Sequence, residues 1–215
     1  MEEKEYNQFI SNKYKALRKR SFKSSLDLYL FHIILNSESK ELDSESFIDF
    51  NPSDQLIKEY EDSWQIINGP IKKGGPTVEE LDKEFKWFKE NKSQMESFEK
   101  AYQAYFNTIL SVEDLKELYP IDQKIRVCQY CETSESDLIE LRVKGLIRTK
   151  RYTRGWTLEI DRIEPNKEYN KDNLILACYW CNQAKTDEFS HDEFIPVGKV
   201  IGEIWKKRKI ELDKP

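Results

Sequence analysis

Apolar and aromatic positions in the first half of the chain recur at the three- and four-residue spacing of amphipathic helices. This spacing predicts helices over residues 5–20, 22–36, 53–67 and 77–109, the last two opened by a Ser53 cap and a Thr77–Glu80 capping box. A Ser111–Asp114 pair predicts one more short helix. Aromatic side chains at helical spacing are typical of a packed core, so we expect them to fill the interior of this region.

The pattern changes in the second half, where apolar and polar residues alternate from Trp156 to Asp161 as in a half-buried strand. Pro165 stops this strand, and after a polar loop residues 174–177 read as a short apolar strand. Residues 182–186 read as a short helix, and a Ser190–Glu193 capping box starts another. The expected fold class is therefore α+β, with a mainly helical N-terminal region and a small strand–loop–strand–helix module after it.

All four cysteines lie in this second half, as the pairs Cys128–Cys131 and Cys178–Cys181. Two residues between cysteines allow a tight turn to direct both sulfurs at one ion, and two such turns complete the four-thiolate shell that Zn²⁺ prefers. We expect a closed, structural zinc site. The alternatives are one redox-active pair or four unrelated buried thiols.

Charge divides the chain in the same way as the pattern. Residues 1–120 carry a net charge of −6 and residues 121–215 a net charge of +1. We therefore expect two domains with different roles: a helical domain over 1–120 that recruits a protein partner or positions substrate, and the cysteine-containing module over 121–215.

Composition argues against a membrane protein, since no apolar run approaches the ~18 residues that a membrane span needs. The first residues, Met1 to Tyr6, lack the basic and apolar regions of a secretory signal. Aromatic residues make up 13% of the chain and recur throughout, which argues against disorder. The expectation is a cytoplasmic protein with no membrane partner.

The run from Leu158 through Asp161, Arg162 and Pro165, followed by Asn173-Leu-Ile-Leu-Ala-Cys178-Tyr-Trp-Cys181-Asn182-Gln-Ala-Lys185, resembles the HNH endonuclease motif. This family has the ββα-metal, or His-Me finger, fold, here with a zinc-binding cysteine quartet. The resemblance covers residues 128–190, under a third of the chain.

The resemblance implies a role for four residues. Asp161 matches the acidic ligand of a catalytic divalent metal, Mg²⁺ or Mn²⁺, and Asn182 matches the second ligand. Asn173 matches the residue that orients the general base, and Lys185 matches a basic residue that faces phosphate. The implied activity is metal-dependent hydrolysis of phosphodiester bonds in DNA, with phage (antiviral) defence or a mobile element as the context by analogy.

One position departs from the family. The general base is a His directly after the acidic ligand, and this chain has Arg162 there. A guanidinium stays protonated and has no acceptor, so it cannot take a proton from water. Arg162 would then clamp the scissile phosphate, or the site has lost hydrolysis. Of the two histidines, His32 reads as a core residue and His191 as an exposed first-turn residue, with a substitute base as the alternative for His191.

Between residues 142 and 162 there are seven basic residues and two acidic ones. Basic residues interleaved with Tyr152 and Trp156 suit phosphate contact and base stacking, so we expect nucleic-acid contact here. The candidate residues are Arg148, Lys150, Arg151 and Arg154. The alternative is the solvated face of a hairpin.

Two other functions stay open at this point. The module could be a catalytically silent HNH-like nucleic-acid-binding module or a subunit of a larger complex. A zinc-stabilised protein-interaction domain is the third interpretation, which the acidic pI of 5.4 favours mildly.

Overall fold

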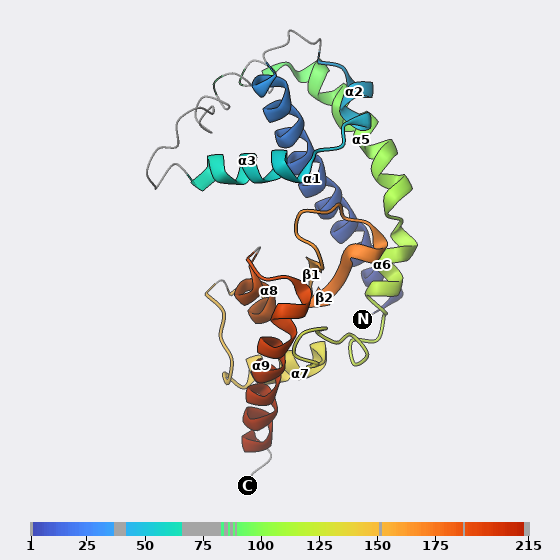
Figure 1. Cartoon of the computed structure of the whole chain (residues 1–215). Helices are drawn as coiled ribbons and strands as arrows, with labels where there is room; N and C mark the ends of the chain where they lie inside the picture. Colours follow the sequence, from blue (N-terminus) through green and yellow to red (C-terminus); the bar gives the residue numbers. More distant parts are fainter. Residues whose placement is uncertain are drawn as a thin grey trace. The chain divides into compact units, whose positions relative to one another are not determined.

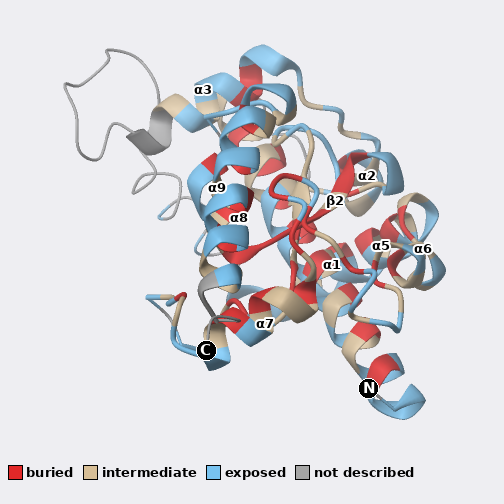
Figure 2. Ribbon diagram, turned by 90° about the horizontal axis from the view of Figure 1, so that it is seen from below, coloured by how far each residue is buried: buried red, intermediate tan, exposed pale blue. Residues whose placement is uncertain are grey.

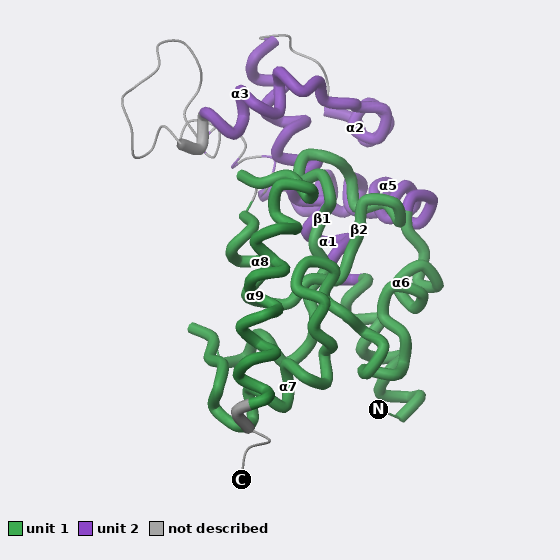
Figure 3. Tube along the Cα trace, turned by 60° about the horizontal axis from the view of Figure 1, so that its bottom comes forward, with its two compact units in different colours: residues 1–14, 110–215 green, residues 15–109 purple. Residues whose placement is uncertain are grey.

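The computed structural model describes residues 2–36, 42–65, 83, 86, 88, 90–150, 152–186 and 188–212. The chain forms two compact units: unit 1 contains Met1–Tyr14 and Leu110–Pro215, and unit 2 contains Lys15–Ile109 (Figure 3). Residues 1–14 and 110–120, which the sequence analysis assigned to the helical domain, thus belong to the same unit as the cysteines. The division of roles between residues 1–120 and 121–215 stays a prediction.

The elements follow in this order along the chain (Figure 1): α1 Glu3–Leu35, α2 Ser44–Asp49, α3 Asp54–Gln65, α5 Lys92–Ile109, α6 Val112–Leu118, α7 Glu135–Val143, β1 Glu159–Arg162, β2 Leu174–Ala177, α8 Tyr179–Lys185 and α9 His191–Leu212. A 3-10 turn, Lys171–Asn173, leads into β2.

Unit 2 has an aromatic core, as the helical spacing predicted. The ring of Phe47 in α2 stacks on Phe98 and Tyr102 of α5, with centroids 5.2 and 5.6 Å apart. The break expected near residue 21 is wrong, because α1 continues through it. Ser21 is buried, and its hydroxyl hydrogen-bonds that of Tyr102 at 2.7 Å, so a polar residue in mid-helix has a partner.

The helix predicted over 77–109 is also corrected. Its expected start at Thr77 lies outside the described residues; the described residues 83, 86, 88 and 90 are helical, and after a break at Asn91 the helix α5 begins at Lys92. Asn91 interrupts the pattern, since its side-chain oxygen accepts the backbone N–H of Gln94 at 3.3 Å in the manner of an N-cap. The capping boxes at Ser111–Asp114 and Ser190–Glu193 are confirmed at α6 and α9.

The sheet of unit 1 consists of β1 and β2, which pair antiparallel with Glu159 opposite Ala177 and Arg162 opposite Leu174. Strand β2 matches its predicted bounds and is mostly buried (Figure 2). Helix α8 packs against β1, and α7 and α8 pack against α9.

Strand β1 begins three residues later than predicted. The backbone N–H of Leu158 donates to the Glu135 carboxylate at 2.7 Å, so this N–H is not available for a strand ladder. The hairpin considered for the basic stretch is not formed: residues 144–158, except the undescribed 151, adopt turns, bends and irregular backbone.

The start of α1 is held to this unit by tyrosine hydroxyls. Tyr6 donates to the carbonyl of Tyr119 at 2.7 Å, and Tyr14 donates to that of Leu110 at 2.9 Å.

None of the described helices is long and apolar enough to cross a membrane. The fold-class prediction is confirmed for the described residues, which are mostly helical with one two-stranded sheet beside a four-cysteine cluster.

Candidate active site

The four cysteines meet in one buried cluster. The Sγ atoms of Cys128, Cys131, Cys178 and Cys181 all lie within 4.8 Å of one another, and those of Cys131 and Cys178 are 3.8 Å apart. Four thiolates at about 2.3 Å from a tetrahedral zinc would lie about 3.8 Å from each other. Hydrogen bonds from the other three thiols, Cys131 first, hold the pKa of Cys128 well below its usual range. The donor set and spacing therefore fit a metal ion such as zinc.

Backbone contacts hold both cysteine turns in place. The N–H of Gln129 donates to Leu176 of β2 at 2.8 Å, which ties the first turn to the sheet. Cys178 is the N-cap of α8, and its sulfur accepts the N–H of Cys181 at 3.4 Å. The sequence folds this way locally because each C-x-x-C pair closes a turn and the second pair also begins a helix.

Helix α9 covers the first cysteine turn through two glycines one turn apart. A Cβ atom at Gly198 would lie 2.6 Å from Tyr130, and one at Gly202 would collide with the Cys131 carbonyl oxygen. Glycine is needed at both positions because the helix approaches the backbone of the metal-binding turn directly.

Replacing Gly202 with Ala is therefore expected to destabilise unit 1 by about 3 kcal/mol, because the methyl group meets backbone that cannot move without distorting the cysteine cluster. The measurement is chemical denaturation followed by circular dichroism. Lys199→Ala, on an exposed position of the same helix, is the control and should change stability by less than about 0.5 kcal/mol. Equal stability of the two variants would contradict the close approach.

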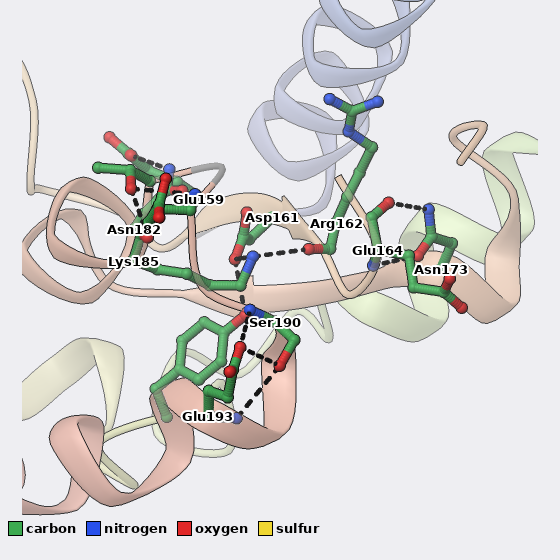
Figure 4. A network of polar contacts seen from close by, with 12 residues as sticks. Glu159, Asp161, Arg162, Glu164, Asn173, Asn182, Lys185, Ser190 and Glu193 are labelled. Atoms are coloured by element: carbon green, nitrogen blue, oxygen red, sulfur yellow. Dashed lines mark hydrogen bonds and ion pairs between the residues drawn. The ribbon is translucent and has the colours of Figure 1, made fainter. Parts of the chain in front are cut away.

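Asp161 lies on the face of β1 that α8 covers. Its Oδ2 atom accepts the hydroxyl of Tyr130 at 2.7 Å and lies 3.6 Å from the ammonium of Lys185 (Figure 4). The side chain of Lys185 is 1% exposed, and its Nζ also donates to the Arg162 carbonyl at 3.3 Å. Lys185 therefore contacts the Asp161 carboxylate and does not face solvent, in contrast to the expectation that it faces phosphate.

Tyr130 joins the cysteine cluster to Asp161, because it stands between Cys128 and Cys131 in the first turn. It is fully buried, and its ring packs edge-on against Phe194 at 5.1 Å. Burial, and then the hydrogen bond to Asp161, raise the pKa of Tyr130, so the phenol keeps its proton and acts as the donor. The sequence analysis missed this residue, although its place inside the C-x-x-C turn was a visible signal.

Tyr130→Phe is expected to lower the free energy of unfolding by about 1.5–3 kcal/mol, since it removes a hydrogen bond to a charged group and leaves the ring in place. Thermal and chemical denaturation would measure the loss. Tyr152→Phe is the matched control, because Tyr152 is 83% exposed, and it should have no measurable effect. A loss of the same size in both variants would show that the Tyr130 hydroxyl makes no special contribution.

A second polar contact lies on the same face of β1, at Glu159, two residues before Asp161 in the strand. The Nδ2 of Asn182 donates to Glu159 Oε2 at 2.8 Å, and Arg154 binds the same carboxylate through Nε at 2.9 Å and Nη2 at 2.6 Å. The guanidinium of Arg154 also lies over the Tyr179 ring at 4.8 Å, and the hydrogen bond to Glu159 raises the pKa of Arg154. Glu159 was missed, although the two-residue period of a strand places it on the Asp161 face.

Arg162 and Asn173 lie on the other side of the strand end. The Arg162 side chain points away from the Asp161 carboxylate (Figure 4), lies over Tyr169 at 4.7 Å and donates to the Lys167 carbonyl at 3.1 Å. Asn173 is buried, and its side chain binds backbone only: its Oδ1 accepts from the Glu164 N–H at 2.8 Å, and its Nδ2 donates to the carbonyls of Glu164 and Glu168 at 3.1 and 2.9 Å. Asn173 thereby fixes the loop that follows Arg162.

The basic stretch is only partly exposed. Arg148 and Lys150 are exposed, Arg154 is paired with Glu159, and Arg151 lies outside the described residues. Arg142 holds the segment in shape, since its guanidinium stacks on Trp156 at 3.9 Å and donates to the carbonyls of Tyr152 and Arg154.

Neither histidine lies as the sequence suggested. His191 is half-buried against the Tyr130 ring, with centroids 5.4 Å apart, and is not an exposed first-turn residue. His32 is half-buried and not fully buried: it hydrogen-bonds the exposed Asn36, and its ring centroid lies 5.0 Å from that of Phe50.

Asp161 and Asn182 fit the donor set of a hydrated divalent cation. The Asn182 amide donates an Nδ2 N–H to Glu159, which leaves Oδ1 as an acceptor, and carboxylate and amide oxygens suit Mg²⁺ or Mn²⁺. The ion pair with Lys185 partly neutralises Asp161, so a cation would compete with this ammonium for the carboxylate.

The comparisons with known proteins are sparse. No family model matches the chain, and no curated protein matches it. A solved structure of the rare-cutting HNH restriction endonuclease PacI is similar to 51% of this chain and 75% of that chain, at 26% sequence identity and a TM-score of 0.41.

Proposed function

We propose that the chain is a metal-dependent endonuclease that hydrolyses phosphodiester bonds in DNA, with a structural zinc ion at the four cysteines. One observation carries the proposal: Asp161 of β1 and Asn182 of α8 lie on the facing surfaces of a packed strand and helix, beside the cysteine cluster. A carboxylate and an amide oxygen from these two elements form a cation-binding pair. A divalent cation there would stabilise the charge that develops on the phosphate and the leaving oxygen.

The other residues of the site have supporting tasks. Tyr130 and Lys185 orient the Asp161 carboxylate, and Asn173 fixes the loop after β1. Arg162 has no acceptor for a proton, so we assign it to phosphate binding and not to base catalysis. Its guanidinium lies over the Tyr169 ring and donates through Nη1 to the Lys167 carbonyl, and at intermediate exposure its remaining N–H groups are the donors that we assign to phosphate.

The exposed Arg148 and Lys150, together with Arg151, supply the expected phosphate contacts of the DNA backbone, whereas the guanidinium of Arg154 is bound to Glu159. Contacts of this kind are independent of base sequence and weaken steeply with salt. We place the protein in the cytoplasm, in phage defence or a mobile element, with the helical unit as the part that recruits a partner or positions substrate.

A second candidate function is a silent nucleic-acid-binding module. The observation that favours it is the pairing of Asp161 with an almost fully buried lysine, together with an arginine at the base position. A site that no longer needs a cation could keep its fold with this internal ion pair.

The test is cleavage of supercoiled plasmid by the zinc-loaded full chain, with and without added Mg²⁺ or Mn²⁺, and with no chelator so that the zinc stays bound. Nicked or linear DNA that forms only with the added cation is the expected result. Salt-sensitive DNA binding without cleavage would overturn the nuclease and support the silent module. Neither binding nor cleavage would favour the protein-interaction domain, and a parallel duplex RNA substrate tests the choice of DNA.

A further inference from the structure

Helix α9 has two different faces. Its inner face packs into unit 1 through Gly198 and Gly202, with Phe194 and Trp205 at 1% and 7% exposure. Its outer face presents Val197, Val200 and Ile204 to solvent, at 43%, 62% and 41% exposure. Three large apolar side chains in a row on a solvent-facing helix surface are not explained by the core of the unit.

The spacing on this outer face is that of a coiled-coil seam. With exposed Glu193 before the three apolar residues and exposed Lys207 after them, the steps are four, three, four and three residues. This alternation keeps all five positions on one side of the helix and is the heptad pattern by which two helices pack together. We call these five residues the α9 seam.

The charges on the seam are self-complementary in one orientation only. Glu193 stands at one end and Lys207 at the other, each seven residues from the central Val200. If two copies pair antiparallel about Val200, Glu193 of each copy faces Lys207 of the other, and Val197 lies against Ile204. Parallel pairing would instead place like charges opposite each other at both ends.

We propose that the chain forms a two-fold symmetric homodimer in which the α9 seams of two copies pack antiparallel. A two-fold axis requires a self-complementary surface, and the seam meets that requirement in both its apolar and its charged positions. The seam between Glu193 and Lys207 is about 21 Å long, which suits a moderate, concentration-dependent association.

The first test is the mass of the zinc-loaded full chain by light scattering and sedimentation equilibrium, at concentrations up to about 100 µM, where micromolar association is detected. A dimer that dissociates on dilution is expected. A monomer at every concentration would overturn the proposal, and so would a dimer that Val200→Glu leaves intact. The measurement uses no DNA, so its outcome is independent of the nuclease proposal.

Val200→Glu places two carboxylates at the centre of the apolar seam and should weaken the dimer by at least about 100-fold. Lys199→Glu is the matched control, because it introduces the same side chain at an exposed position of α9 outside the seam. This control should leave the association unchanged. Far-ultraviolet circular dichroism and the melting temperature verify that both variants fold.

A charge-reversal cycle tests the antiparallel register. Lys207→Glu should weaken the dimer about tenfold, because it faces Glu193 of the other copy, and adding Glu193→Lys should restore the association. Glu193 also belongs to the α9 capping box. The melting temperature of the Glu193→Lys single variant is therefore measured as well, to separate the loss of the cap from the loss of the dimer. No effect of Lys207→Glu, or no restoration by the double reversal, would overturn this register.

Discussion

Replacing Cys178 with Ser is expected to abolish the cooperative folding of the unit that contains residues 1–14 and 110–215. The four sulfurs lie within 4.8 Å of one another in the interior, and serine supplies a neutral hydroxyl where zinc needs a thiolate. Zinc binding at such sites contributes about 10–16 kcal/mol, which is as large as the whole stability of a typical domain. Cys178 also caps α8, so its loss frees the start of the helix that carries Asn182 and Lys185.

Zinc content per chain and far-ultraviolet circular dichroism are the measurements for this variant. Gln129→Ala is the matched control, because Gln129 is exposed between the two cysteines of the first turn and offers no ligand. In the native chain, removal of zinc by a chelator should unfold the unit, and returning zinc should refold it. Native zinc content and melting in Cys178→Ser would rule out the four-cysteine site.

The features that the sequence predicted well are those determined by neighbours along the chain. A C-x-x-C pair needs only two intervening residues to form its turn, and β2 is a four-residue apolar segment between a polar loop and a cysteine. The Ser111–Asp114 capping box also closes within one helical turn. Interactions between residues so close in sequence can be predicted from their spacing alone.

The contacts that define the candidate site are long-range, and the sequence did not reveal them. Tyr130 meets Asp161 across 31 residues, and Asn182 meets Glu159 across 23. The burial of Lys185 depends on α8 packing against β1, so a sequence pattern that suggested a phosphate contact could not predict an internal ion pair. The direction in which the Arg162 side chain points could have been predicted from the sequence, because neighbouring residues in a strand point to opposite faces.

Asp161→Asn is expected to lower plasmid cleavage by about 10³-fold or more, since a cation site that loses its carboxylate forfeits several kcal/mol of charge stabilisation. The structure adds a second consequence. The substitution leaves the Lys185 ammonium, 1% exposed, without its carboxylate, and breaking such a pair costs about 3 kcal/mol of stability. Loss of cleavage in this variant alone would therefore not separate a catalytic role from a structural one.

A compensated variant separates the two roles. Lys185→Met replaces the ammonium by an apolar side chain of similar length, so Asp161→Asn with Lys185→Met contains no unpaired charge at the site. The double variant should recover most of the stability that Asp161→Asn loses, as measured by chemical denaturation, while its cleavage stays at the level of the single variant. Because the fold would then be intact without activity, the carboxylate itself would be required for cleavage. Recovery of cleavage together with stability would instead assign Asp161 a structural role and remove it from the proposed cation site.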